Sequence, residues 1–139
     1  RRVWRLAGPL MANNMADVII NQALSAVDEV WGIEVPLIYD TLWAGTTDLV
    51  GVFRGQPAIM DFKTTNRPKT SDRVEDYRLQ LMAYLMSHNL TFGTDIKQAV
   101  IFMVSRDLTY QQFVVTADQM EEYEIKWLQR VEQYYRDHM

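Results

Sequence analysis

The chain has 139 residues, of which 48% are hydrophobic, and a formal charge of −4. This length suits one compact domain with a single core, so we expect one domain over residues 1–139. The absence of cysteine excludes disulfides and zinc–thiolate sites and favours an intracellular protein, and no apolar run approaches the length of a membrane span. The acidic balance argues against indiscriminate binding of nucleic acid, which requires clustered lysine and arginine.

The hydrophobic pattern predicts, in chain order, a helix, three strands, a helix, two strands and a final helix. Apolar residues at helical spacing predict helices over 9–27, 72–89 and about 117–137. Apolar or alternating runs predict a strand around Glu34, two strands flanking Arg54-Gly55, and strands over 96–105 and 110–116. This order is typical of an α/β or α+β fold with a mixed sheet flanked by helices.

Two short runs carry the side chains best suited to chemistry, Gly45-Thr46-Thr47-Asp48 and Asp61-Phe62-Lys63. Between them, Arg54-Gly55 is expected to form a two-residue hairpin loop. Counting back from this loop places Asp48 directly opposite Asp61 in a pair without ladder hydrogen bonds, with Cβ atoms about 4.5 to 5.5 Å apart.

The strand period of two puts Asp48, Asp61 and Lys63 on one face of the sheet. Both faces are largely apolar, so we expect both to be covered. Two carboxylates this close repel unless a proton or a cation neutralises the pair, and Mg²⁺ prefers such hard oxygen ligands. Lys63 is placed to orient or deprotonate a water molecule, or to stabilise charge on phosphoryl oxygens. These residues predict metal-dependent phosphodiester chemistry.

The helix that follows places Gln80 and Tyr84 four residues apart on one face. The ordered set Gly45-x-x-Asp48, Asp61-x-Lys63 and Gln80-x-x-x-Tyr84 resembles the RecB-like branch of the PD-(D/E)XK nuclease superfamily. Within that branch the chain resembles the mitochondrial genome maintenance exonucleases and similar phage and bacterial exonucleases. The resemblance covers about residues 33–134 and implies a restriction-endonuclease-like core.

The resemblance also implies roles for individual residues. Asp48, Asp61 and the backbone carbonyl of Phe62 would bind the metal, Mg²⁺ or Mn²⁺, and Lys63 would be the catalytic lysine. Glu34 stands where such families have a glutamate, which would act from a second shell or through water; the alternative is an exposed strand glutamate.

Gln80 and Tyr84 would line the DNA path or buttress the site. The alternative makes Tyr84 a core aromatic residue and Gln80 a helix surface residue.

One feature departs from the family pattern, which usually has a histidine on an upstream helix. The only histidines are His88 and His138, and we expect both at the surface. Because the chain begins at Arg1 without methionine, we also expect that an N-terminal segment is missing.

DNA binding would need a local basic patch, because the whole chain is acidic. The candidates follow the catalytic strand and begin the next helix: Lys63, Arg67, Lys69, Arg73 and Arg78. Thr64 and the loop around Pro68 belong to the same stretch. The alternative is a solvated connector.

These observations predict a Mg²⁺-dependent deoxyribonuclease, an exonuclease acting on single-stranded DNA ends in replication, recombination or repair. Its place would be the cytoplasm of a bacterium or a phage-infected host, with the mitochondrial matrix as an alternative, and we expect no membrane contact. Two other hypotheses remain: an endonuclease of the same superfamily, and a noncatalytic DNA-binding subunit with a nuclease-like fold.

Overall fold

The computed structural model describes residues 13–138. The first helical segment is α2 (Asn13–Val18), which continues as a π-helical turn (Ile19–Ala23) and a 3₁₀ turn (Leu24–Ala26). The predicted helix over 9–27 therefore ends one residue early, and its first four residues lie outside the described part.

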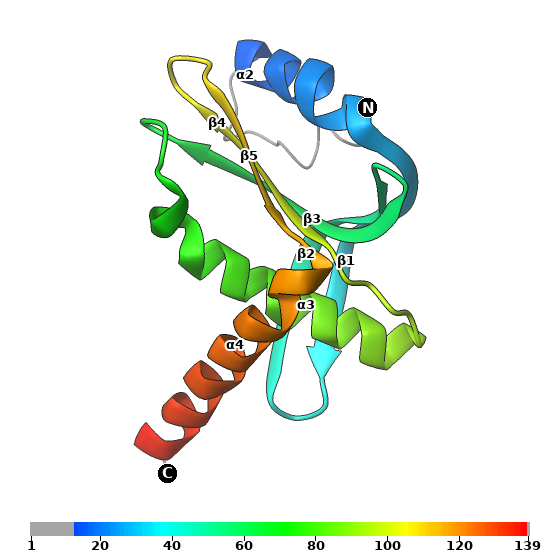
Figure 1. Cartoon of the computed structure of the whole chain (residues 1–139), viewed down its shortest axis with the longest axis vertical. Helices are drawn as coiled ribbons and strands as arrows, with labels where there is room; N and C mark the ends of the chain where they lie inside the picture. Colours follow the sequence, from blue (N-terminus) through cyan, green and yellow to red (C-terminus); the bar gives the residue numbers. More distant parts are fainter. Residues whose placement is uncertain (1–12, 139) are drawn as a thin grey trace.

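A five-stranded mixed sheet forms the centre of the fold (Figure 1). Its strands are β1 (Val27–Tyr39), β2 (Trp43–Phe53), β3 (Gln56–Thr65), β4 (Ala99–Ser105) and β5 (Tyr110–Val115). They lie in chain order, and all neighbours are antiparallel except β3 and β4, which are parallel. A parallel pair needs a crossover, which here contains helix α3 (Glu75–Phe92). The predicted mixed sheet with flanking helices is confirmed.

The β2–β3 hairpin has the predicted register. Five pairs run from Phe53–Gln56 to Leu49–Met60. The loop Arg54–Gly55 has positive φ at both residues, 48° and 81°, as a type I′ turn requires. One step beyond the last pair, the register places Asp48 opposite Asp61, and the ladder ends there.

Both faces of the sheet are covered, as predicted. On one face, sheet residues such as Val50 and Ile101 pack with Leu81 and Leu85 of α3. On the other face, a second core packs the sheet against α2 and the turns after it; its members include Met15, Ile19, Leu49, Met60 and Phe102. The sheet is therefore the middle layer of three.

Helix α4 (Ala117–Asp137) packs beside α3 (Figure 1). In its C-terminal half, the Tyr135 hydroxyl donates a hydrogen bond to the Leu42 carbonyl in the turn between β1 and β2. Trp127 of α4 meets Trp43 of β2 edge to face, with ring centroids 5.4 Å apart. Arg130 and Asp76 join α4 to α3 through an exposed ion pair at 2.8 Å. Within residues 13–138, no helix has the length and apolar character needed to cross a membrane.

Candidate active site

The carboxylates of Asp48 and Asp61 lie where β2 and β3 stop pairing. Asp48 Oδ2 accepts a hydrogen bond from the backbone N–H of Phe62 at 2.9 Å, so the side chain replaces the next main-chain ladder bond. Burial, together with a hydrogen bond and charge repulsion from Asp61, raises the pKa of Asp48 to about 8. In the absence of a cation, this pair therefore holds a proton at neutral pH.

Lys63 lies between Asp61 of β3 and Gln80 of α3. Its Nζ lies 2.8 Å from Asp61 Oδ2, donates to Gln80 Oε1 at 3.1 Å, and stands 4.8 Å from the centre of the Tyr77 ring. Burial acts to lower the pKa of Lys63, but the charge of Asp61 and its hydrogen bond outweigh burial and raise it. Lys63 is therefore a cation at neutral pH, suited to stabilising negative charge on phosphoryl oxygens.

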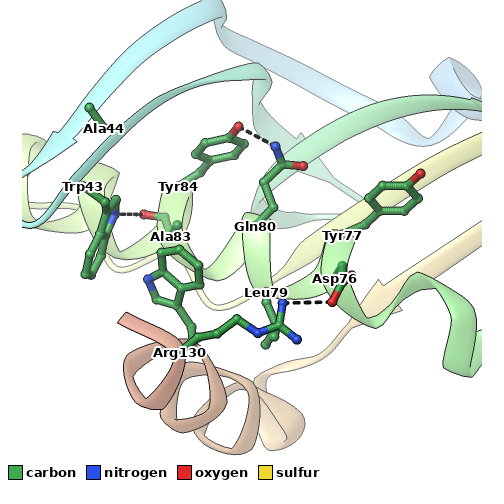
Figure 2. A pocket seen from close by; sticks show the side chains of 10 residues that line it. Trp43, Ala44, Asp76, Tyr77, Leu79, Gln80, Ala83, Tyr84 and Arg130 are labelled. Atoms are coloured by element: carbon green, nitrogen blue, oxygen red, sulfur yellow. Dashed lines mark hydrogen bonds and ion pairs between the residues drawn. The ribbon is translucent and has the colours of Figure 1, made fainter. Parts of the chain in front are cut away.

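Gln80 and Tyr84 continue the hydrogen-bonded chain along α3. Gln80 Nε2 donates to the Tyr84 hydroxyl at 2.9 Å (Figure 2). The side-chain oxygen of Gln80 accepts a hydrogen bond from Lys63. Gly45 lies against the Tyr84 ring, where a Cβ would come within 2.6 Å of Tyr84 Cε1. Tyr84 is therefore both a buried aromatic residue and a polar neighbour of the site, so the two alternatives for this residue are not exclusive.

The donor atoms fit a small, hard cation. Asp61 Oδ2 is buried, and among residues 13–138 its only polar partner is the Lys63 ammonium. Since the N–H and C=O of a strand residue point to the same side, the Phe62 carbonyl also faces β2, beyond the last ladder pair. No group of three or more acidic, histidine or cysteine side chains gathers within the described part. Mg²⁺ commonly binds through one or two carboxylates plus water and substrate oxygens, so Asp48 and Asp61 suffice.

Glu34 lies close to Asp48 in the strand register, but its side chain does not join the carboxylates of Asp48 and Asp61. The pairs Ile33–Leu49 and Val35–Thr47 place Glu34 opposite Asp48 on β1. Its side chain is exposed, and its φ of 51° is uncommon for a residue other than glycine.

The predicted basic patch is only partly assembled. Thr64 and Lys69 line a polar cavity of about 320 Å³ past the end of β3, whose other walls include Asn66, Tyr77 and Arg106. Arg106 was missed by sequence reasoning, because it lies 43 residues after Lys63 in the loop between β4 and β5. Its backbone N–H donates to the Thr65 carbonyl at 3.1 Å, which brings that loop to the end of β3.

Arg67 and Arg73 are exposed and do not line this cavity. The prediction that Arg78 belongs to the basic patch was wrong. Arg78 is 7% exposed. Its guanidinium donates hydrogen bonds to the backbone carbonyl and the hydroxyl of Ser71 and lies over the Phe113 ring. The Arg78 side chain packs between the helices and β5, so its charge is buried and is not part of an exposed basic surface.

The prediction of a surface position was wrong for His88. This side chain is 7% exposed, and its Nδ1 shares a 2.8 Å hydrogen bond with Thr94 Oγ1. Burial lowers the pKa of His88, so it is a neutral packing residue at the end of α3. His138 is exposed, as predicted.

A sheet-borne carboxylate pair beside a lysine, backed by a glutamine–tyrosine helix, is the arrangement of one class of nucleases. The profile of the PD-(D/E)XK nuclease superfamily matches residues 4–138, and the chain belongs to this superfamily.

Known proteins similar to the chain include mitochondrial genome maintenance exonuclease 1 of Homo sapiens, 27% identical over 120 residues that cover 83% of this chain and 35% of the relative. The Mus musculus protein of the same name is 26% identical, with 83% and 36% covered. The chain thus spans about a third of the length of these relatives. The crystal structure of a "Putative exonuclease" from Eubacterium rectale shares the fold, with a TM-score of 0.53 at 15% identity, covering 90% of this chain and 54% of that one.

Proposed function

We propose that this protein is a Mg²⁺- or Mn²⁺-dependent DNA exonuclease that hydrolyses phosphodiester bonds at single-stranded ends. The observation that carries the proposal is the Asp48–Asp61–Lys63 cluster at the point where β2 and β3 part. Asp61 Oδ2 is buried beside the Lys63 ammonium and close to a second carboxylate, Asp48. In a member of a nuclease superfamily, this arrangement supports a catalytic cation site over a structural ion pair.

Each residue of the cluster has a definable task. Asp48 and Asp61 would hold the divalent cation, which supplies Lewis-acid activation of water and charge neutralisation at the scissile phosphate. Lys63, a cation at neutral pH, would hold the phosphoryl oxygens and stabilise their growing negative charge. Gln80 would orient the lysine, because its side-chain oxygen accepts the Lys63 hydrogen bond and its nitrogen is held by Tyr84.

The choice of an exonuclease is supported by the name of the human and mouse relatives. Replication, recombination or repair is the setting in which single-stranded DNA ends arise, and we place the protein inside a cell, in a bacterial or phage-infected cytoplasm or a mitochondrial matrix.

A comparison of linear and circular substrates tests the proposal. We expect single-stranded DNA labelled at its 5′ or 3′ end to be degraded with Mg²⁺ or Mn²⁺, and the reaction to stop with EDTA. A circular single strand should remain intact, because it offers no end. Cutting of the circle would show an endonuclease of the same superfamily, and binding without cleavage would show a noncatalytic subunit.

The polar cavity beyond β3 predicts where the DNA backbone leaves the site. Lys69 and Arg106 line this cavity and form no ion pair among the described residues. We expect Lys69→Ala or Arg106→Ala each to lower the slope of log affinity against log salt by about 0.7, the value for one phosphate contact to a single strand. Fluorescence anisotropy in EDTA measures this slope.

Arg54→Ala is the matched control, since Arg54 is an exposed cation at the β2–β3 turn, far along the hairpin from the site. An equal change in slope for all three variants would mean that the protein attracts DNA only through its general charge.

A further inference from the structure

We propose that the cavity between α3, α4 and β2 is a binding pocket for one unpaired nucleobase of the DNA strand. This inference rests on the proposed function and extends it, because it assigns a specific place to the base next to the cleaved phosphate. It would also account in structural terms for the proposed preference for single strands.

The cavity begins one hydrogen bond away from the catalytic lysine. Its volume is about 430 Å³, and Gln80, which accepts from Lys63, forms part of its wall. The remaining lining comes from three elements, β2, α3 and α4: Trp43, Ala44, Asp76, Tyr77, Leu79, Ala83, Tyr84, Trp127 and Arg130. Figure 2 shows the labelled side chains of Trp43, Tyr84, Gln80 and Tyr77 in a row along the cavity, with Arg130 facing them from α4.

The aromatic walls are held rigidly before any ligand arrives. The Trp43 ring stacks on Tyr39 with centroids 4.2 Å apart and meets Trp127 edge to face. The indole N–H of Trp43 donates to the Ala83 carbonyl at 3.0 Å and to Ser87 Oγ at 2.9 Å. Fixed aromatic planes are the surfaces on which unpaired bases stack, and fixing them in advance reduces the entropy lost on binding.

Trp127 provides a polar reason for choosing a base over a purely apolar group. Its Nε1 is buried and has no acceptor within residues 13–138. A buried donor without a partner is destabilising, and it is rare in native proteins. Nucleobases carry ring nitrogens and carbonyl oxygens that can accept this hydrogen bond, whereas an aliphatic side chain cannot.

Arg130 provides a cation at the rim of the cavity. Its only charged partner in the described part is Asp76, at 2.8 Å, and both side chains are more than half exposed. Exposed pairs of this kind contribute little to stability, so the guanidinium can turn to a phosphate at small cost. The cavity also continues along α4 into a second hollow with walls at Leu42, Tyr134 and Tyr135. A flexible strand could therefore run on past the first base.

A base stacked and paired within a duplex cannot enter this cavity, because it would have to leave the helix first, at a cost of a few kcal/mol. A single strand avoids that cost. Double-stranded DNA would accordingly be a poor substrate until its ends fray.

A scan with abasic nucleotides tests the pocket directly. In EDTA, a short single strand carrying one abasic nucleotide at each successive position would be titrated against the protein by fluorescence anisotropy. We expect one position, or two adjacent ones, at which the missing base weakens binding by about 5- to 150-fold, the range given by stacking of one base on aromatic side chains.

The same scan on Trp127→Leu locates the effect. We expect the penalty at that position to fall below about threefold, because the variant no longer has the indole that the base contacts. Trp127→Phe keeps an aromatic plane but lacks the indole N–H, so it should retain the stacking part of the penalty and lose the hydrogen-bond part. Leu128→Ala is the matched control, because Leu128 is the next residue on α4, is 42% exposed and does not line the cavity.

A penalty of the same size at every position, or one unchanged in a folded Trp127→Leu variant, would overturn the inference. If Trp127→Leu fails to fold, the position dependence in the unaltered protein still decides the matter. Because binding is measured without metal, the two proposals are separable. Cleavage with a flat abasic scan would refute only the base pocket, and a position-dependent scan without any cleavage would refute only the nuclease.

Discussion

Asparagine in place of Asp61 is expected to slow DNA hydrolysis by at least about 1,000-fold while leaving the protein folded. The change removes one of the two carboxylates available to the cation, and loss of a charge-stabilising group at a reacting centre costs several kcal/mol of transition-state stabilisation. The side chain remains the same size, and Asp61 is 3% exposed, so the packing around it is preserved. The initial rate of release of labelled nucleotide from linear single-stranded DNA measures the effect.

The matched control is Asp95→Asn, which removes a carboxylate paired with Lys97 at 3.4 Å on an exposed loop. We expect its rate to stay within about twofold of the unaltered protein. A rate for Asp61→Asn within tenfold of normal, with an unchanged thermal melting profile, would remove Asp61 from the catalytic machinery and with it the proposed mechanism.

Mg²⁺ is expected to raise the melting temperature by an amount that increases with pH. In the metal-free folded protein the pKa of Asp48 is raised to about 8, compared with an ordinary value near 3.9. Between about pH 4 and pH 8 the folded state therefore binds a proton that the unfolded state lacks, so this group lowers stability progressively as pH rises through that window. The cation needs the ionised carboxylate and must displace this proton, so its apparent affinity falls as pH drops below 8.

The size of the effect follows from mass action. With Mg²⁺ at 100 times its Kd at pH 8.5, the stabilisation is about 2.7 kcal/mol, which corresponds to roughly 10 °C for a chain of this length. Two pH units below the Asp48 pKa, the Kd is about 100-fold weaker, and the same Mg²⁺ should raise the melting temperature by only about 1 to 2 °C. Differential scanning fluorimetry from pH 5.5 to 8.5 would show the trend.

Asp48→Asn is the informative variant for this linkage. It keeps an oxygen for the Phe62 N–H but removes both the raised pKa and the metal ligand. We therefore expect the metal-free variant to melt higher than the unaltered protein at pH 8.5, with little response to Mg²⁺. A response to Mg²⁺ that is independent of pH in the unaltered protein would show that the ion binds elsewhere.

Short-range rules were sufficient to predict the centre of the site. Because a two-residue loop at Arg54–Gly55 fixes the hairpin register, the opposition of Asp48 and Asp61 followed from counting alone. The four-residue spacing of Gln80 and Tyr84 placed them on one helix face for the same local reason. Each of these inferences uses one turn or one helical period. Which side chains share a face therefore follows from local geometry and does not depend on tertiary contacts.

Charge and polarity were poorer guides, because they depend on what lies across the fold. Arg78 was expected in a DNA-facing patch, but aromatic rings from β5 and α4 cover it, and Ser71 satisfies its donors. His88 was expected outside, and the turn after α3 folds Thr94 back onto it. A polar side chain becomes buried when a partner arrives from elsewhere, and the sequence around it does not reveal that partner.

Part of the walls of the two cavities was also beyond sequence reasoning, although Gln80, Tyr84, Thr64 and Lys69 were predicted site residues. Trp127 and Arg130 lie more than 60 residues after Lys63, and Arg106 enters through the β4–β5 loop. Their proximity to the site depends on the parallel crossover and on the angle at which α4 meets the β1–β2 hairpin. Only the assembled layers determine that angle.

The close approach of Gly45 to Tyr84 makes the two most separated motifs of the chain depend on one another. The space beside β2 is filled either by a hydrogen at residue 45 and a ring at residue 84, or by a larger side chain at the first and a smaller one at the second. Across related sequences the two positions should therefore change together, with a bulkier residue at 45 found only where the tyrosine has been lost. If Gly45→Ala lowers activity, a genetic selection should recover a second substitution that replaces Tyr84 with a smaller side chain and restores activity. Such a pair would show that the two positions are coupled in evolution.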